Sequence, residues 1–515
     1  MKNICLVVVL CLFSTVFAHA QENDPITAMI NKLKNMYPEL PVLSKEKMYQ
    51  DFDSLVTIIK NCNPQRLVIK QATGFDILKE MLLLRGNIEH IDNTMDFVRL
   101  LRKALNYNMD IHACLNVNVW YFKSMFYEKE VELIQIPISA YAYTFYYRDS
   151  IFKDSEKTTI LLYYTDGNYY FKHNTVLYNE NDSATVEAGS KILLLNSEPV
   201  IKLQSEQKKF DSGYDFVHKL FYNSQLTIPL PVNTIQYEEN GKIKNFSFRS
   251  FKEARRKFNF RQFHVSDIKW LDKDSVLYLR LPLMSQNLVA QMRDSLLQLK
   301  NQPIKAIVVD IRENYGGNDS TWINLLGLIY DTCFTFQSSL LVNDSKEVQL
   351  RYPVSLGKKK HDILDSSYYF NILDDDISVL YPDTVTMGYK GNIYILVDDE
   401  IASSAQSFAS LSVVNSKIKT VGIKTGRYGG RGATPSVFLL PNSGFIFTLN
   451  IMLDDVYVKE VEDFYHDKVS YPINPSVDYI KFWNDPNRPY VISQEDLYTK
   501  DEIFLRTLEI IKNEH

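Results

Sequence analysis

Two short apolar runs in the C-terminal half constrain the fold most. "IKAIVVDIR" (304–312) and "GNIYILVDD" (391–399) carry branched apolar residues at consecutive positions, without polar alternation. Such strands are buried on both faces, which is typical of a parallel sheet covered by helices. Helical patterns alternate with them in "QNLVAQMRDSLLQLK", "STWINLLGLIYDTC" and "SSAQSFASLSVV". From about Asp267 onward the chain is therefore predicted to form an α/β domain, with "SVLYLRLPL" and "KTVGIKT" as further strands.

The chain before Asp267 divides into a helical and a β-rich part. Residues from about 43 to 115 follow a helical pattern, and in "NTMDFVRLLRKALNYN" either Asn93 or Thr94 can cap the helix. Residues from about 130 to 260 form short alternating runs, and "DGN" and "ENGK" are good hairpin turns. The pattern also allows a helix around 214–221.

Composition excludes several classes of protein. The chain has 515 residues, of which 45% are hydrophobic and 23% charged, as in a soluble globular protein of several domains. Its formal net charge is −5, and its Lys and Arg residues form no basic block, so nucleic acid is not the expected partner. Three well-separated cysteines, Cys62, Cys114 and Cys333, follow the first twenty residues, and they allow at most one disulfide.

The first twenty residues, "MKNICLVVVLCLFSTVFAHA", read as a cleaved secretory signal. They contain a lysine, a short apolar run and a small-x-small site at 18–20. No later stretch approaches the roughly twenty apolar residues of a membrane helix. We therefore expect an exported protein, periplasmic or extracellular, without a stable membrane span.

Three loops follow predicted strands, where α/β sheets place their ligand sites. In "DIRENYGGND" the pair Gly316-Gly317 can turn backbone N–H groups toward an anionic oxygen, or it can simply relieve a tight turn. In "VDDEIASSAQSFAS" either Ser403 or Ser404 can be a nucleophile or a helix N-cap. "KTGRYGGRGA" (424–433) shapes the same pocket or forms an exposed hairpin.

A nucleophilic serine needs a base. His112 in "YNMDIHACL" is the candidate, because it begins a predicted strand directly after a helix, although a structural histidine also fits there. The sequence contains no Gly-x-Ser-x-Gly elbow, Walker loop, His-Glu-x-x-His or Cys-x-x-Cys. The pair Asp398-Asp399 reads as a solvated turn, so glycosidase and metalloenzyme chemistry is not expected.

Taken in chain order, these segments resemble the tail-specific or carboxy-terminal processing serine proteases, and more closely their tricorn-like, retinoid-binding-protein-like branch. "YNMDIHACL" is similar to the Asp-Gly-His-Thr segment, and "IVVDIRENYGGNDS" to Asp-x-Arg-x-Asn-x-Gly-Gly. "ILVDDEIASSAQSFAS" is similar to the nucleophile segment, and "AGSKILLLNSEPV" (188–200) to the core of a PDZ-like domain. "VGIKTGRYGGRGA" resembles the Gly-Glu-x-Thr-Gly-Gly-Gly loop that follows the nucleophile segment in the family. "YPINPSVDY" resembles the closing Gly-Val-x-Pro-Asp segment.

The resemblance implies a fold of the α/β plus β class. A signal peptide (1–20) precedes an N-terminal helical region that carries the histidine (21–129). A PDZ-like β domain (130–265) and an α/β, crotonase-like (ββα) serine protease domain (266–515) follow.

The resemblance also assigns roles to individual residues. Ser403 is the implied nucleophile, and the backbone N–H groups of Gly317 and Ser404 form the implied oxyanion hole. Tyr428 stands where the bacterial branch has its lysine base, so the base is His112. The acidic helper falls near Val469, and its candidates are Asp467 and Glu462, with Glu460 close by.

The implied function is that of an exported serine endopeptidase. Its partner is a peptide or an unfolded protein, held near its carboxyl end by strand addition to the PDZ-like domain. No metal or cofactor is implied. The departures around His112, Ile111 and Ala113, leave a second reading open, a non-catalytic peptide-binding or scaffold protein of the same fold. An esterase or acyl transferase that uses the same serine is a third.

Overall fold

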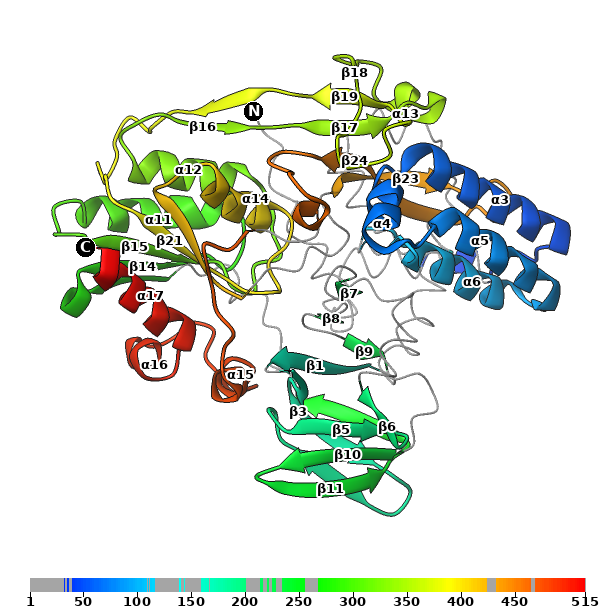
Figure 1. Ribbon diagram of the computed structural model, residues 1–515, viewed down its shortest axis with the longest axis horizontal. Helices are drawn as coiled ribbons and strands as arrows, with labels where there is room; N and C mark the ends of the chain where they lie inside the picture. Colours follow the sequence, from blue (N-terminus) through cyan, green and yellow to red (C-terminus); the bar gives the residue numbers. More distant parts are fainter. Residues whose placement is uncertain are drawn as a thin grey trace.

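Figure 1 shows the computed structural model of the chain, which describes residues 32, 35–36, 39–108, 110, 112–115, 139, 143, 159–165, 167–200, 214–215, 220–221, 225–227, 234–254, 267–423, 432–464 and 468–514. The predicted signal peptide (1–20), Tyr428 and Asp467 lie outside these residues. Within them, no helix combines the length and the apolar character needed to cross a membrane. Cys62, Cys114 and Cys333 are free thiols.

The N-terminal part is helical, as predicted. Its helices are α3 (Lys45–Cys62), α4 (Gln65–Thr73), α5 (Ile77–Arg85), the 3-10 helix η3 (Gly86–His90) and α6 (Thr94–Asn106). Asn93 caps α6 by accepting a hydrogen bond from the N–H of Asp96 over 2.9 Å. The apolar face of α6 is buried together with apolar residues of two strands from the C-terminal half, β17 (Leu340–Asn343) and β24 (Ile446–Asp454).

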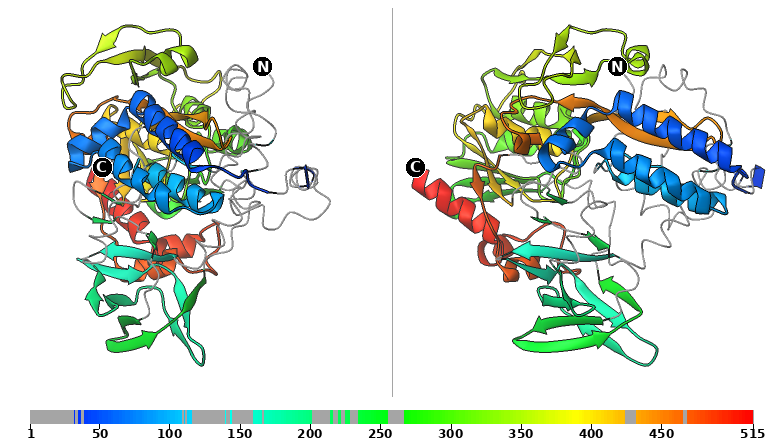
Figure 2. Two further views of the ribbon diagram at one scale, coloured as in Figure 1. Left: turned by 90° about the vertical axis from the view of Figure 1, so that its right-hand side faces the viewer. Right: turned by 45° about the vertical axis from the view of Figure 1, so that its right-hand side comes forward.

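A β domain follows, and Figure 2 shows it at one end of the molecule in both views. Its strands are β1 (Thr159–Thr165), β2 (Asn168–Phe171), β3 (Asn174–Tyr178), β4 (Ser183–Val186), β5 (Lys191–Leu195), β6 (Glu198–Pro199), β7 (Tyr214–Asp215), β8 (Leu220–Phe221), β9 (Gln225–Thr227), β10 (Thr234–Glu239), β11 (Lys242–Ser247) and β12 (Ser250–Ala254). The "DGN" and "ENGK" turns join β1 to β2 and β10 to β11, as predicted. The helix allowed around 214–221 is wrong, because β7 and β8 pair there.

The C-terminal half contains the predicted α/β sheet, in the order β13-β14-β15-β21-β22-β25. The strands from β14 to β25 are parallel, and β13 is an antiparallel edge. The elements of this layer are β13 (Asp267–Leu271), the 3-10 helix η5 (Asp272–Asp274), β14 (Val276–Arg280), α11 (Gln286–Gln298), β15 (Ala306–Asp310), α12 (Ser320–Ile329), β21 (Ile393–Val397), α14 (Ser404–Ser410), the 3-10 helix η6 (Leu411–Val413), β22 (Ile418–Gly422), β25 (Tyr471–Pro472), α15 (Val477–Trp483), α16 (Gln494–Thr499) and α17 (Glu502–Glu514).

Both faces of this sheet are buried, because successive side chains of a strand point to opposite faces. Ile307, Val309 and Ile395 pack with α11, α12 and α14 on one face. Val308 and Tyr394 pack with α15, α16 and α17 on the other. Strands β15 and β21 are neighbours, so the loops after them leave the same edge of the sheet side by side.

A second sheet, in the order β18-β19-β17-β24-β23, packs its apolar side chains with those of the N-terminal helices. The remaining elements are β16 (Phe334–Gln337), β17 (Leu340–Asn343), α13 (Lys346–Arg351), β18 (Lys358–Lys359), β19 (Phe370–Asp374), β20 (Ile377–Leu380), β23 (Gly432–Leu439), β24 (Ile446–Asp454) and the 3-10 helix η7 (Val461–Phe464). Strand β24 is buried up to Leu453, and it supplies the residues that hold His112.

Candidate active site

Ser403 lies on the turn between β21 and α14 and is exposed. Its backbone has φ 54° and ψ −127°, which residues with a Cβ rarely adopt. Strain of this kind costs on the order of 1–3 kcal/mol and concentrates at functional sites, including strand-to-helix turns that expose a nucleophile. Ser403 occupies the N-cap position of α14, but its side chain makes no capping hydrogen bond. The helix-cap alternative therefore fails for this serine.

The loop after β15 packs directly against the Ser403 turn. Gly316 has φ 99°, and a Cβ placed on it would lie 2.7 Å from Cβ of Ser403 and 2.6 Å from the carbonyl oxygen of Ala402. Atoms cannot approach so closely, so any side chain at this position would push the two loops apart. The close approach explains why the turn needs a glycine at 316.

Asn314 joins the same two loops. Its carbonyl oxygen accepts from the N–H of Ala402 over 3.0 Å, and its side-chain Oδ1 accepts from the N–H of Gly316 over 2.8 Å. Asn314 is fully buried, and its Nδ2 donates to the carbonyl of Leu281 at the end of β14. This residue stands in the "DIRENYGGND" segment, but its role could not be read from the sequence.

Two backbone donors are left beside the serine. The carbonyl of Gly316 accepts a hydrogen bond from the N–H of Met284, and the carbonyl of Met284 accepts one from the N–H of Asn318. Gly317 lies between these two bonded residues, and its own N–H is not used in the pairing. In the described part of the chain, neither the N–H of Gly317 nor that of Ser404 has an acceptor. Free N–H groups next to an exposed hydroxyl are the arrangement that stabilises an oxyanion.

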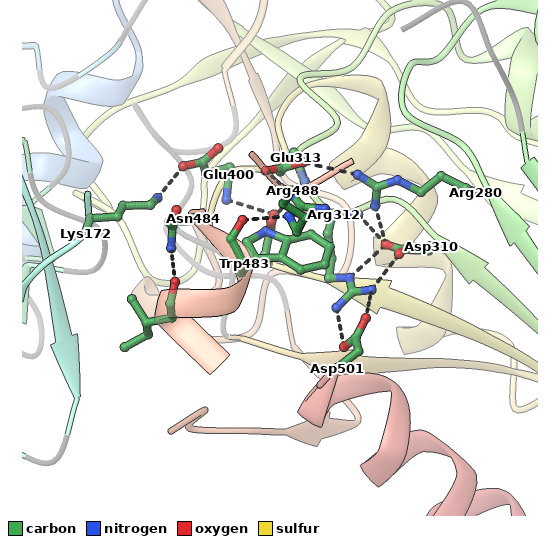
Figure 3. Close-up of polar contacts among 12 residues, drawn as sticks. Lys172, Arg280, Asp310, Arg312, Glu313, Glu400, Trp483, Asn484, Arg488 and Asp501 are labelled. Atoms are coloured by element: carbon green, nitrogen blue, oxygen red, sulfur yellow. Dashed lines mark hydrogen bonds and ion pairs between the residues drawn. The ribbon is translucent and has the colours of Figure 1, made fainter. Parts of the chain in front are cut away.

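A buried ion-pair network anchors the base of the loop after β15 (Figure 3). Asp310 accepts hydrogen bonds from Arg280 and Arg312, each over 2.6 Å, and all three side chains are fully buried. Arg312 also holds Asp501 at the start of α17, over 2.8 and 2.7 Å, and lies over the ring of Trp483. Burial alone would raise the pKa of Asp310, but the two guanidinium groups outweigh it and hold that pKa well below its usual range.

Asp398 and Asp399 are buried, with 3% and 5% of their surface exposed, so their prediction as a solvated turn is wrong. Asp398 accepts from the N–H groups of Glu313 and Glu400, over 3.0 and 3.1 Å. Burial, together with the neighbouring carboxylates, raises the pKa of Asp398 well above its usual value. Burial also raises the pKa of Asp399 to about 6, although Lys172 opposes this shift. Lys172 comes from the β domain, so no local sequence pattern could show that it acts on this turn.

His112 lies after α6 and is held by its own segment and by β24. Oδ1 of Asp110 lies 2.8 Å from the N–H of His112 and 3.0 Å from ring Nδ1. Oδ2 of Asp110 accepts from Nδ2 of Asn450 over 2.6 Å, and Thr448 donates to the carbonyl of His112. Nδ2 of Asn450 also lies 3.1 Å from Nδ1 of His112, but its shorter contact is with the carboxylate. A carboxylate at Nδ1 favours the tautomer that keeps the proton there, which leaves Nε2 as the basic nitrogen.

Among the described residues, Asp110 places a carboxylate next to His112, the position for which Glu462 and Asp467 were predicted candidates. Glu462 lies in η7, and Asp467 is outside the described residues. The carboxylate that lies against His112 is that of Asp110, whose side chain is 2% exposed. Its position two residues before the histidine is a signal that was available in "YNMDIHACL". Nothing in the sequence around Asn450 indicates its contact, which sheet pairing alone creates.

The described residues thus contain two preorganised halves of a site. One half consists of Ser403 with the N–H groups of Gly317 and Ser404, and the other is His112 with Asp110. The described residues give no hydrogen bond between His112 and Ser403. In the same part of the chain, no group of three or more His, Cys, Asp or Glu side chains is arranged to hold a metal ion.

Comparison with known proteins gives a family match for one segment and similar solved structures for most of the chain. Residues 275–461 match the model of peptidase family S41. Mature CPAF complexed with lactacystin is similar over 91% of this chain and 99% of its own, at 13% identity and a TM-score of 0.56. Mature CPAF alone has a TM-score of 0.55 at 13% identity, over 91% and 98% of the two chains. At these identities the structural likeness concerns the fold.

A search of curated proteins found no match. The family match spans both the Gly316-Gly317 loop and the Ser403 turn, and the similar structures extend over most of the chain. Residues 275–461 of this chain thus match peptidase family S41, the tail-specific protease family, and this match indicates a serine-type peptidase.

Proposed function

We propose that Ser403 is the nucleophile of this peptidase and that His112 is its general base. Nε2 of His112 takes the proton of the Ser403 hydroxyl as Oγ attacks the scissile carbonyl carbon. The N–H groups of Gly317 and Ser404 stabilise the resulting oxyanion. His112 then protonates the leaving amine, and water hydrolyses the acyl-enzyme by the same route in reverse.

The strained backbone of Ser403 carries this proposal. A serine that merely capped α14 would adopt an extended backbone and accept a hydrogen bond from the helix, as Ser476 does at the start of α15. Ser403 instead has a positive φ, makes no such bond and lies against Gly316. Hydrogen bonds between a base and its nucleophile often form only once substrate is bound, so the proposal does not require one in the free protein.

Asp110 acts in this scheme as a positioning residue for His112. Its carboxylate fixes the ring tautomer and stabilises the imidazolium that forms when Ser403 is deprotonated. Asn450 in turn holds the second oxygen of that carboxylate. We propose Asp110 for this role in place of Glu462 or Asp467.

The substrate that we propose is an extended peptide or an unfolded protein segment, bound near its carboxyl end. The β domain is proposed to be PDZ-like and to hold this segment by strand addition, and the α/β layer to be crotonase-like. The proposed setting is the periplasm or the exterior of the cell, after cleavage of the signal peptide.

The test combines labelling by a fluorophosphonate probe with hydrolysis of carboxy-terminal peptides. We expect the wild type to be labelled at Ser403, and Ser403→Ala and His112→Ala to lose both labelling and hydrolysis. Two control variants are matched to these, Ser407→Ala on the exposed face of α14 and His90→Ala at the exposed end of η3, and both should retain activity.

Each outcome separates the candidate functions. Activity that survives Ser403→Ala and His112→Ala overturns the assignment of both residues. A folded wild type that the probe does not label at Ser403 favours a peptide-binding scaffold. Hydrolysis of small esters without hydrolysis of any peptide would favour an esterase.

A further inference from the structure

One contact joins the β domain to the loop that carries the nucleophile. Lys172 lies in the turn between β2 and β3, and its Nζ is ion-paired with Oε1 of Glu400, three residues before Ser403 (Figure 3). The side chain of Lys172 is only 6% exposed, although lysine is rarely buried unless it is paired. The pair therefore lies inside the interface between the β domain and the protease layer.

Lys172 compensates a concentration of negative charge. Burial would raise the pKa of Glu400, but Lys172 outweighs it, so the pKa of Glu400 lies below its usual value. The same ammonium group acts on Asp399 and Asp398. Lys172 is the more deeply buried member of the pair, since 24% of the Glu400 side chain is exposed. Removing the cation beside a partly buried carboxylate costs more than removing an exposed pair, because part of the remaining charge stays desolvated. Without Lys172, Glu400 would keep its hydrogen bond from Tyr315, and we expect its carboxylate to shift further toward water.

A movement of Glu400 would displace both loops that supply the proposed oxyanion N–H groups, those of Gly317 and Ser404. Its second oxygen accepts from the hydroxyl of Tyr315 over 2.9 Å, and Tyr315 directly precedes Gly316. On the other side, the chain runs from Glu400 to Ser403 through Ala402, whose N–H is bound by Asn314. The carboxylate of Glu400 therefore bridges the loop that offers the N–H of Gly317 and the loop that offers the N–H of Ser404.

A second contact, between the Gly189 turn and α15, joins the same end of the β domain to the protease layer. Gly189 has φ 79°, and a Cβ on it would lie 2.6 Å from Cε of Lys481 and 2.7 Å from Cγ1 of Val477, both on α15. The N–H of Gly189 donates to the carbonyl of Phe171, the residue before Lys172, over 2.8 Å. The Gly189 turn and Lys172 thus form one docking face against the protease layer.

We propose that Lys172 of the β domain is a positioning residue of the protease site. Through Glu400 it fixes the relative position of the loop that carries Gly317 and the loop that carries Ser404. This inference rests on the proposed function of Ser403, Gly317 and Ser404. It implies that an intact α/β layer does not acylate Ser403 rapidly unless the docking face of the β domain is in contact with it. A displacement of about 1 Å at such a site can cost about 100-fold in rate.

The experiment compares matched pairs of full-length variants. Lys172→Met removes the buried cation, and its control Arg249→Met removes an exposed cation that pairs with Glu180 in the same domain. Gly189→Ala places a Cβ 2.7 Å from Cγ1 of Val477 on α15, whereas its control Gly241→Ala alters another turn of the domain with φ 72° and no atom within 4 Å of the new Cβ. Each variant is first checked for folding by its unfolding curve.

Two measurements are made on every variant. The first is the rate constant for fluorophosphonate labelling of Ser403, which needs no peptide binding. We expect it to fall about 10- to 100-fold in Lys172→Met and Gly189→Ala, and to stay within about twofold of wild type in both controls. The second is hydrogen exchange of segments 313–317 and 398–404, which should accelerate in the same two variants only.

The two measurements keep the inference separate from the proposed function. Labelling and exchange in Lys172→Met that equal those of Arg249→Met would overturn the role of Lys172. If the wild type is not labelled at all, the proposed function fails, and hydrogen exchange alone decides whether Lys172 holds the loops.

Discussion

The side-chain amide of Asn450 donates to the carboxylate of Asp110 over 2.6 Å and thereby joins β24 to the segment that carries His112. The other oxygen of the same carboxylate lies 3.0 Å from Nδ1 of His112. The orientation of the proposed base therefore depends on a strand more than three hundred residues further along the chain.

Asp110→Asn should lower kcat for peptide hydrolysis by about 10²–10⁴-fold, with KM little changed. An amide cannot stabilise the imidazolium, and it can reverse the tautomer of His112. Steady-state kinetics measure the effect, and Asp96→Asn is the control, because Asp96 pairs with Arg99 on the exposed surface of α6. A variant of Asp110 that keeps activity within twofold of the control would remove this residue from the mechanism.

Gly316→Ala should abolish fluorophosphonate labelling while leaving most of the protein folded. The new Cβ would collide with Cβ of Ser403 and with the carbonyl of Ala402. Gly388→Ala is the matched control, because Gly388 also has a positive φ, 63°, but no atom lies within 4 Å of its Cβ position. Both variants carry backbone strain of about 1–2 kcal/mol, so equal labelling of the two would show that the contact with Ser403 is unimportant.

Asp501→Asn should destabilise the protein by about 3 kcal/mol, measured as the free energy of unfolding in urea. It removes one partner of a buried pair in which both side chains are fully buried, and Arg312 keeps its charge. Glu509→Gln is the control, because it breaks an exposed pair with Arg506 on α17. It should lower the free energy of unfolding by less than about 1 kcal/mol. Similar losses in the two variants would mean that the network around Arg312 is not the anchor described above.

Asp399→Asn should change how stability depends on pH. The pKa of Asp399 is about 6 in the folded protein and about 3.9 when unfolded, so the folded state binds more protons between these values. The contribution of Asp399 protonation to the free energy of unfolding is complete below pH 4 and is lost as the pH rises through 6. Relative to Asp399→Asn, the wild type should therefore lose up to about 3 kcal/mol between pH 4 and 7, since one pKa unit is worth about 1.4 kcal/mol.

Urea unfolding at several pH values between 4 and 7.5 measures this difference. Lys172 and Glu400 remain in both proteins, so their titration affects both curves. A wild type that gains stability relative to Asp399→Asn as the pH rises would contradict the buried environment of this carboxyl group.

Much of the fold could be predicted because its signals are local. The runs that became β15 and β21 are apolar on both faces, and only a sheet covered by helices on both sides buries such strands. The Asn240-Gly241 turn adopts the positive φ values, 52° and 72°, that its residue types allow, so the hairpin was predictable too. The placement of Ser403 and Gly316 after neighbouring strands followed from the same reasoning.

The sequence by itself therefore determined the elements, their faces and the loops in which chemistry can occur. The tertiary structure alone decided which charges became buried, because a charge leaves water only where folding brings it a partner. The sequence predicted Asp398 and Asp399 to be solvated, but both are buried in the fold, where Lys172 of the β domain pairs with the adjacent Glu400. Asp110 likewise receives the side chain of Asn450 only because β24 lies beside it. Apolar patterns repeat within a few residues, whereas these polar partners are hundreds of residues apart.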